Sequence, residues 1–504
     1  MPTVEELTLS GLLPHLVRDE AGWTATWRAL TLHSVFQPVL SITHQRIVGY
    51  EALLRAFDPV GLPVTPDVLF SGTRSAGEAR ELDRIARCLH VANFMEQHVE
   101  VGWLFLNTRP QVFETGWPQR AFIDELSAHF GLPQERIVIE VLEQPADDES
   151  AVASMLAASQ PRDFLIAIDD FGTGFSNFDR VWRFRPDIVK LDRSLVARAG
   201  KSQGDESLIG HLIAMLHQSG TLVLAEGVET DDELMILMQA DVDFVQGFWL
   251  GQPKGSVQAA CARVPALIDS MWRKFAEFER KHARHKQLGF EGFAEAVLAE
   301  GVETDDELMI LMQADVDFVQ GFWLGQPKGS VQAACARVPA LIDSMWRKFA
   351  DYERKYARHK QLGFEGFAEA VLAAAGSFAA NGDLAEAARL VFPIPEARRV
   401  FVTDAQGEQT LPSISAPAVP PPPQRLAPLL ATTRSNWSRR AYFKHALAAP
   451  GRVAMMGPHY SLIDGQDCYT AAVTLEHGGK TTILCVDFIP GEPNPPATPG
   501  VRKR

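Results

Sequence analysis

The sequence has little cysteine and no long apolar run. Five cysteines occur in 504 residues, and none forms a CxxC pair, so we expect neither a disulfide framework nor a zinc site. No stretch approaches the roughly 18 consecutive apolar residues of a membrane span. The N-terminus also lacks the basic start and apolar segment of a signal peptide. These absences predict a cytoplasmic protein in a reducing setting. The cysteines are Cys88, Cys261, Cys335, Cys468 and Cys485.

Positive charge is also scarce, because 48 lysines and arginines face 63 acidic residues and leave a net charge of −15. This balance argues against non-specific binding to a nucleic-acid polymer. It is compatible with acid-rich metal sites and small-molecule substrates. The hydrophobic content of 46% can fill sizeable cores, and the length predicts two to four domains, or one large barrel with additions.

The most informative stretch is Ile166-Ala-Ile-Asp-Asp-Phe-Gly-Thr-Gly174. A short apolar run ends in two adjacent carboxylates, Asp169 and Asp170, and a glycine-rich loop follows. A buried strand that delivers two acids to its carboxyl end is what a divalent-metal site on an α/β barrel requires. An ordinary strand-to-loop turn is the alternative, since Asp and Gly are common in turns.

Strand and helix patterns alternate through the first half of the chain. Only a short turn joins the apolar strands 35–42 and 47–54, so they must pair antiparallel, because a parallel crossover needs a dozen or more residues. Six further strands are predicted, mostly with helices between them. This order predicts a TIM-like (β/α)8 barrel whose first strand is reversed. The six strands are 101–107, 136–142, 164–169, 188–191, 221–226 and one starting at 244–246.

A polar residue stands at or near the carboxyl end of almost every predicted strand. One such residue would be an ordinary loop residue, but the whole set is better explained by a common site, because strand carboxyl ends form the mouth of this barrel class. The residues are Glu51, Asn107, Glu140, Asp169, Asp170, Lys190, Glu226 and Gln246.

These residues and their neighbours resemble the EAL family of cyclic di-GMP phosphodiesterases. The resemblance covers residues 33–253 in order and spacing. It is carried by Glu51-Ala-Leu-Leu-Arg55, Phe105-Leu-Asn-Thr108, Glu140-Val-Leu-Glu143, Asp169-Asp-Phe-Gly-Thr-Gly174, Lys190-Leu-Asp192, Ala225-Glu-Gly-Val-Glu229 and Gln246-Gly-Phe248.

The resemblance implies hydrolysis of cyclic di-GMP to pGpG with two Mg²⁺ or Mn²⁺ ions. Two such ions can hold a water and a phosphate together, and hard oxygen ligands select them. Lys190 is expected to hold the attacking water, with Glu226 orienting it or acting as base. The metal ligands implied are Glu51, Asn107, Glu140, Asp169, Asp170 and Gln246; Arg55 should bind a phosphate, Gln37 a guanine, and Glu143 should anchor the Gly-Thr-Gly loop.

One departure from the family pattern is Leu142, where the family usually has Thr; it removes no ligand. We therefore favour an enzyme. The alternatives are a cyclic di-GMP receptor that turns over poorly, or a scaffold that binds no nucleotide. A homodimer is expected from the resemblance alone.

A tandem duplication interrupts the pattern. Residues 223–296 recur as 297–370 with three differences, so a second strand-helix-strand unit carries its own Glu300 and Gln320. A barrel of fixed strand number accommodates one copy only. We expect the first copy to close the barrel, because residues 220–222 connect it to the preceding strand. The second copy is then an insert with a risk of aggregation or domain swapping.

The C-terminal third predicts a small antiparallel sheet crossed by one helix, similar to the PAS-like, Cache-type sensory domains found after some EAL domains. Trp437, Arg440, Tyr442 and Phe443 carry this likeness, and they are interpreted as either a ligand cage or core, with core favoured. The ligand of such a domain is unknown. The predicted parts are a helical lead-in 1–32, barrel 33–255, helix plus duplicated segment 256–328, helical linker 329–390, sensory domain 391–489 and disordered tail 490–504.

Overall fold

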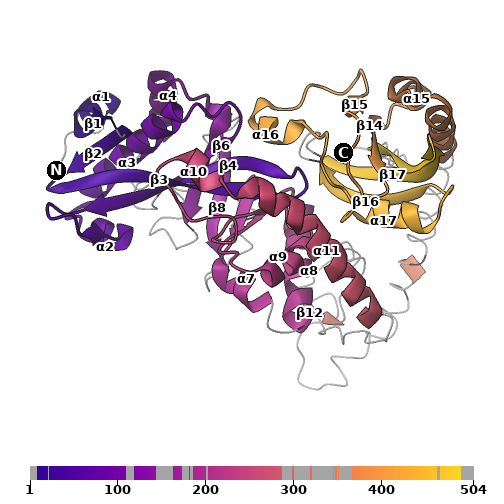
Figure 1. Ribbon diagram of the computed structural model, residues 1–504, viewed down its shortest axis with the longest axis horizontal. Coiled ribbons are helices and arrows are strands. Elements are labelled where there is room, and N and C mark those ends of the chain that lie inside the picture. The colour runs from indigo at the N-terminus through magenta and orange to yellow at the C-terminus, as the bar shows by residue number, and fades with distance from the viewer. Residues whose placement is uncertain are drawn as a thin grey trace, which may run out of the picture. The chain divides into compact units, whose positions relative to one another are not determined.

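The computed structural model describes most of two domains and parts of the segment between them. The described residues are 8–20, 22–108, 119–142, 163–172, 181, 185–199, 203–286, 298–299, 318–319, 344, 347–348, 350, 366–461 and 466–489. The chain divides into two compact units, Met1–Arg284 with Ala374–Ile489, and His285–Ala373 with Pro490–Arg504. The first unit contains a barrel and a C-terminal sheet (Figure 1). No helix of the described ranges is long and apolar enough to cross a bilayer.

Eight strands close the barrel, which confirms the predicted fold. The sheet order is β3-β11-β10-β9-β8-β7-β6-β4, and β4 pairs back onto β3. β3 is antiparallel to both of its neighbours, and the other pairs are parallel. The strands are β3 Leu30–Ser41, β4 Arg46–Phe57, β6 Trp103–Thr108, β7 Ile137–Leu142, β8 Leu165–Phe171, β9 Ile188–Leu191, β10 Leu222–Ala225 and β11 Phe244–Val245.

Helices follow most of the parallel strands, and local signals fix where several begin. Ser75 accepts a hydrogen bond from the Glu78 backbone at the start of α3, and Thr230 with Glu233 forms a reciprocal capping box at the start of α9. The helices are α2 Pro66–Ser71, α3 Ala76–Glu96, α4 Gln119–Phe130, η3 Gln134–Arg136, α7 Arg193–Ala199, α8 Gln203–Gln218, α9 Asp231–Gln239, α10 Val257–Cys261 and α11 Val264–Lys286.

The predicted helical lead-in is wrong for most of its length. After α1 Leu9–Leu12 and η1 Leu13–His15, the chain forms the hairpin β1 Leu16–Asp19 and β2 Gly22–Trp27, which extends the sheet beyond β3. The physical reason is a period of two, because Ala25 and Trp27 are buried while Thr26 between them is exposed. The short β5 Pro63–Val64 pairs with β4 at the other edge.

Inside the barrel, an apolar floor lies below a polar layer. Each inward strand face carries apolar residues first and a polar residue at its carboxyl end, so Val138 precedes Glu140 and Ile188 precedes Lys190. Trp103, Phe105 and Phe244 fill this floor with edge-on ring contacts. The packed floor closes the lower part of the barrel and leaves the polar layer at its mouth.

The first copy of the duplication supplies the strands that close the barrel. β10 pairs with β9, and β11 pairs with both β10 and β3. In the second copy, β12 Leu298–Ala299 and β13 Phe318–Val319 form a separate two-stranded parallel sheet. Its register, Leu298 with Phe318, repeats that of Leu224 with Phe244. The same local sequence therefore makes the same strand pair, and the pairing to β9 and β3 distinguishes the copies.

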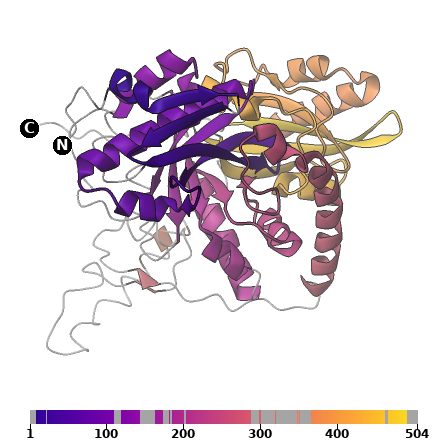
Figure 2. The ribbon, with the colours of Figure 1, turned by 60° about the vertical axis from the view of Figure 1, so that its left-hand side comes forward.

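The C-terminal domain is a five-stranded antiparallel sheet in the order β15-β14-β18-β17-β16 (Figure 1). Helix α17 packs on one face, where Tyr442 and Phe443 are buried against Phe401. Trp437, Arg440 and Tyr442 also line a cavity, so the ligand-cage interpretation keeps support beside the core interpretation. Figure 2 shows the β17–β18 hairpin as a long yellow ribbon. The elements are a helix over 366–381, α15 Leu384–Val391, β14 Ala397–Asp404, β15 Ile414–Ser415, η4 Gln424–Leu426, α16 Ala427–Leu430, α17 Ala441–Ala448, β16 Ala454–Ser461, β17 Gln466–His477 and β18 Lys480–Phe488.

Candidate active site

Strand register brings the predicted polar residues into one layer. Asn107 lies beside Glu140 on neighbouring strands, and Gln37 on the reversed strand lies beside Glu51. Glu51, Glu140, Asp169, Lys190 and Gln246 are all buried, and Asn107 is exposed at the mouth. Residues separated by more than 200 positions thus meet within one barrel.

A break in the β8–β9 register lets two consecutive acids serve the same site. In a regular strand, Asp169 and Asp170 would point to opposite faces. Here the pairing shifts between Ile168 and Phe171, and Asp170 adopts φ = 57°, a backbone conformation uncommon outside glycine. As a result, carboxylate oxygens of Asp169, Asp170 and Glu226 all lie within 4.8 Å of one another.

Lys190 is the charge at the centre of the cluster. Its Nζ lies 2.5 Å from Glu140 Oε1, 2.7 Å from Glu226 Oε1, 3.0 Å from Asp169 Oδ1 and 3.8 Å from Glu51 Oε1. The lysine side chain is 1% exposed, so these interactions act in a medium that screens them weakly. One ammonium therefore faces four carboxylates.

The electrostatics of the cluster show an excess of negative charge. Burial alone would lower the pKa of Lys190, but the surrounding carboxylates outweigh it and raise that pKa well above its ordinary value. Burial raises the pKa of Glu226 to about 8 and that of Asp170 to about 6, with Asp169 adding to both shifts and Lys190 opposing them. Burial, with Glu51 and Asp169 adding, also raises the pKa of Glu140, against the pull of Lys190.

Amide side chains connect Glu51 to the rest of the site. Gln246 Nε2 donates to Glu51 Oε2 at 2.5 Å and lies 3.2 Å from Gln37 Oε1, and Asn107 Nδ2 donates to Glu51 Oε1 at 2.9 Å. Gln37 Nε2 in turn donates to the Gly251 carbonyl at 3.3 Å. Gln246 belongs to the first repeat copy, so that copy completes the layer.

Arg55 follows Glu51 on β4 at the barrel mouth. It is half-buried, and its Nη1 donates to the Leu54 carbonyl at 2.9 Å. Burial lowers the pKa of Arg55, and Glu51 raises it in opposition. The remaining predicted residues, Glu143, Glu300 and Gln320, lie outside the described residues, so their roles stay predictions.

The residues of the cluster fit a pair of divalent cations. When all are ionised, the four carboxylates that face Lys190 and the neighbouring Asp170 exceed the single ammonium by four negative charges, which equals the charge of two such ions. Neither oxygen of Glu140 has hydrogen-bond geometry with a described residue, although Oε1 is near Lys190, and Gln246 Oε1 is likewise unsatisfied among them. Carboxylate and amide oxygens are the ligands that Mg²⁺ and Mn²⁺ prefer.

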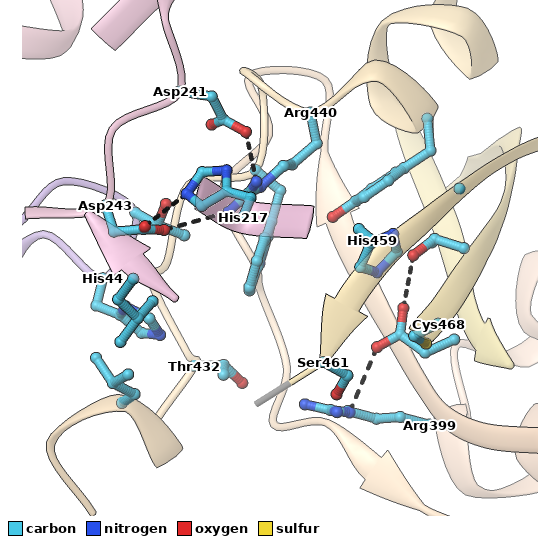
Figure 3. A pocket seen from close by; sticks show the side chains of 18 of the residues that line it. His44, His217, Asp241, Asp243, Arg399, Thr432, Arg440, His459, Ser461 and Cys468 are labelled. Carbon is cyan, nitrogen blue, oxygen red and sulfur yellow. Dashed lines mark hydrogen bonds and ion pairs between the residues drawn. The ribbon is translucent and has the colours of Figure 1, made fainter. Parts of the chain in front are cut away.

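A second feature is a cavity of about 480 Å³ at the opposite ends of β10 and β11 (Figure 3). Trp437, Arg440 and Tyr442, the residues that the sequence offered as a ligand cage or as core, are among those that line it. Barrel residues on one side and C-terminal-domain residues on the other line it. Its walls come from segments 41–44, 217–222, 241–244 and 399–487, which are far apart in the chain. Leu222 and Phe244 line this cavity, whereas Glu226 and Gln246, a few residues further along the same strands, belong to the carboxylate cluster.

The fold and the cluster define an eight-stranded (β/α) barrel with a carboxylate-rich mouth, and comparisons show which known proteins it is similar to. Residues 24–253 match the family model of the EAL domain. This match covers the barrel and less than half of the 504 residues.

An uncharacterised protein of Azorhizobium caulinodans is 30% identical over 233 residues, which are 44% of this chain and 31% of that protein. The probable cyclic di-GMP phosphodiesterase PdeD of Escherichia coli is 28% identical over 228 residues, 43% of this chain and 40% of PdeD. The chain thus spans well under half the length of these relatives.

Solved structures give a similar picture. Klebsiella pneumoniae BlrP1 in a manganese and cyclic di-GMP complex has 25% identity and a TM-score of 0.40, covering 44% of this chain and 56% of that one. Bacillus subtilis YkuI, in complex with cyclic di-GMP and calcium, has 18% identity and a TM-score of 0.40, covering 91% of this chain and 96% of YkuI.

Proposed function

We propose that the barrel hydrolyses cyclic di-GMP to pGpG with the help of two divalent cations. The observation that carries this proposal is the convergence of four carboxylates on Lys190, with Asp170 beside two of them, which is a negatively charged cluster that two divalent cations would balance. The match to the EAL domain and the names of its relatives supply the substrate.

The roles of the residues follow from their positions. Glu51, Asn107, Glu140, Asp169, Asp170 and Gln246 would hold the cations, which when bound supply an acidified water and neutralise charge on the phosphate. Lys190 donates hydrogen bonds that position the attacking water and stabilise charge in the transition state. Glu226 lies 2.7 Å from Lys190 Nζ and, in its ionised form, would accept a proton from the attacking water. The planar guanidinium of Arg55 would donate hydrogen bonds to a phosphate of the substrate, and the Gln37 amide would bind a guanine base.

Product analysis tests this function directly. The purified chain should convert cyclic di-GMP to pGpG in Mg²⁺ or Mn²⁺, and a chelator should stop the conversion until metal is returned. Calorimetric titration with the nucleotide in the same buffers separates binding from turnover. Binding without product would favour the receptor alternative, and absence of binding would reject both.

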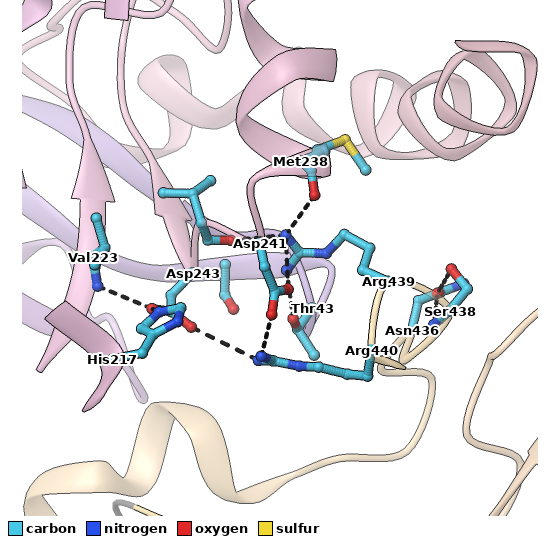
Figure 4. A network of polar contacts seen from close by, with 12 residues as sticks. Thr43, His217, Val223, Met238, Asp241, Asp243, Asn436, Ser438, Arg439 and Arg440 are labelled. Carbon is cyan, nitrogen blue, oxygen red and sulfur yellow. Dashed lines mark hydrogen bonds and ion pairs between the residues drawn. The ribbon is translucent and has the colours of Figure 1, made fainter. Parts of the chain in front are cut away.

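We further propose that the C-terminal domain regulates the barrel through two arginines just before and at the start of α17 (Figure 4). Arg439 is buried and donates to the carbonyls of Met238 and Val242 at 3.2 and 3.0 Å, and to Thr43 Oγ1 at 2.9 Å. Arg440 pairs with Asp241 and lies 3.9 Å from Asp243. The two domains are therefore joined by ionic and hydrogen-bonded contacts that hold the α9–β11 loop.

The contacts of Arg440 reach the start of β10 and β11, the two strands that Glu226 and Gln246 directly follow. Asp243 Oδ2 accepts hydrogen bonds from the Val223 backbone at 2.9 Å and lies 2.7 Å from His217 Nε2. Val223 and Asp243 each precede the respective site residue by three positions, or about 10 Å of extended chain. A change at Arg440 would move the amino-terminal ends of β10 and β11, two short barrel strands, and this supports a physical connection between the cavity and the carboxylate cluster.

Replacing Arg440 by methionine should alter kcat by at least about fivefold, the lower range of typical allosteric coupling. The reason is that Asp241 and Asp243 each lose one positively charged partner while the residues of the carboxylate cluster stay intact. Steady-state kinetics with cyclic di-GMP measures the effect. Arg434→Met is the matched control, because that arginine of the same domain is 84% exposed. Equal kcat and KM in wild type and Arg440→Met would refute regulation through this contact.

A further inference from the structure

Three residues with metal-binding side chains lie on one face of the C-terminal sheet. His459 on β16 is directly opposite Cys468 on β17. Asp487 on β18 is opposite Thr470, two residues further along β17 and hence on the same face as Cys468. Strand register thus sets an imidazole, a thiol and a carboxylate side by side.

The ligand atoms are already close together. The nearest nitrogen, sulfur and oxygen atoms of His459, Cys468 and Asp487 lie within 4.8 Å of one another. Ligands around a tetrahedral zinc ion are about 3.5 Å apart, as the metal–ligand bond lengths require. A side-chain movement of about 1 Å would therefore close the site. His459 is exposed and can supply this movement, while buried Cys468 stays in place.

From this cluster we infer a site for a thiophilic divalent cation, Zn²⁺ above all, in the C-terminal domain. Thiolate and imidazole select zinc over Mg²⁺ and Ca²⁺, in contrast to the all-oxygen set in the barrel. On binding, the Cys468 S–H bond breaks as the sulfur–metal bond forms, and the proton passes to the solvent. The inference is independent of the function proposed for the barrel.

Neighbouring groups orient the carboxylate and tune its affinity. Thr470 Oγ1 donates to Asp487 Oδ1 at 2.8 Å, and Arg399 Nε lies 3.4 Å from Oδ2. Such contacts to a metal-binding carboxylate fix its orientation. The charge of Arg399 also opposes a cation, so the site should bind zinc more weakly than a structural zinc site. The Cys468 thiol makes long contacts to the carbonyls of Phe488 and Tyr469, at 3.4 and 3.5 Å, which metal binding would replace.

The open side of the site faces the cavity. His459, Cys468 and Asp487 all line it (Figure 3). A zinc ion with three protein ligands keeps a fourth position for an exogenous group. A cavity of about 480 Å³ is large enough for a small molecule, so this fourth position would accept a ligand with a carboxylate, imidazole or thiol donor.

Cobalt(II) tests the site, because it reports thiolate ligation by a charge-transfer absorption that oxygen ligands do not give. The full-length chain is stripped with chelator, saturated with Mg²⁺ to occupy the barrel, and titrated with Co²⁺. We expect a thiolate-to-cobalt band that saturates at one equivalent and is bleached by Zn²⁺. Cys468→Ser should abolish the band, and His459→Gln should weaken Co²⁺ binding by at least about tenfold.

Cys261→Ser is the matched control, since it removes a thiol in the barrel and should leave the band unchanged. Circular dichroism verifies folding, and His459→Gln keeps the test valid if Cys468→Ser fails to fold, because His459 is exposed. Absence of a thiolate band in the wild type, a band that survives in a folded Cys468→Ser variant, or unchanged affinity in His459→Gln would each overturn the inference.

Discussion

Replacing Glu226 by glutamine should lower kcat for cyclic di-GMP about 100- to 10,000-fold, the range expected for loss of a general base. Glutamine keeps the shape of the side chain but cannot accept a proton from the water that Lys190 holds. The 2.7 Å contact between Glu226 and Lys190 should persist as a hydrogen bond, so binding of the nucleotide should change little. The kcat loss with a nearly constant KM is the diagnostic result.

The duplication supplies an internal control for this prediction, because Glu300 has the same sequence context as Glu226. Glu300→Gln should leave kcat within about twofold, since β10 and β11 of the first copy pair with β9 and β3 to close the barrel. Loss of activity from Glu300→Gln alone would show that the second copy serves the active site. Equal partial losses would show that both copies do.

Replacing Lys190 by methionine should have the second large effect, on stability as well as activity. Four carboxylates would lose a buried counter-charge, and breaking a buried pair in this way costs about 3–5 kcal/mol. The kcat should fall about 100- to 1,000-fold with the loss of transition-state stabilisation. Thermal unfolding in chelator and steady-state kinetics in Mg²⁺ measure the two effects.

The stability deficit of Lys190→Met should grow with pH. The folded-state pKa values of Glu226 and Asp170 are already raised, to about 8 and about 6, so the stability they contribute is present below their ordinary pKa and is lost as pH rises through those values. Removing the lysine raises these pKa values further and makes ionisation more costly. The difference in unfolding temperature from wild type should therefore widen from pH 5 to pH 9.

Added Mg²⁺ should recover more stability in Lys190→Met than in wild type, because a cation replaces the missing charge. Lys444→Met is the control, since Lys444 pairs with Glu279 at an exposed position where an ion pair contributes about 0–1 kcal/mol. A deficit that is the same at pH 5 and pH 9, or that Mg²⁺ leaves unchanged, would contradict this account of the cluster.

Most of the barrel could be predicted because its signals are local. The four-residue turn at 43–46 made the pairing of the first two strands antiparallel, and the structure confirms this pairing. A polar residue after an apolar strand is visible in sequence, so Glu140 and Lys190 could be identified singly. The N-terminal hairpin differs from the predicted helix because the period-two pattern at Ala25 and Trp27 is short and also fits mixed helical spacing.

What the sequence could not show are features that depend on register between distant segments. The break at Ile168 that turns both Asp169 and Asp170 to one site is a property of the β8–β9 pair. Spacing along the chain excluded a zinc site, whereas the sheet assembles His459, Cys468 and Asp487 from three strands. No local pattern marks such a set.

The amino-acid sequence by itself determined the kinds of element, their order and the chemistry at each strand end, because period-two burial and short turns act over a few residues. The short connection at residues 220–222 also predicted that the first repeat copy closes the barrel, and the strand pairing confirms it. Tertiary structure alone decided how much charge meets at Lys190 and where the domains enclose a cavity. These outcomes depend on strand pairing and on contacts between segments hundreds of residues apart. Two identical local sequences can have different strand partners and different long-range contacts.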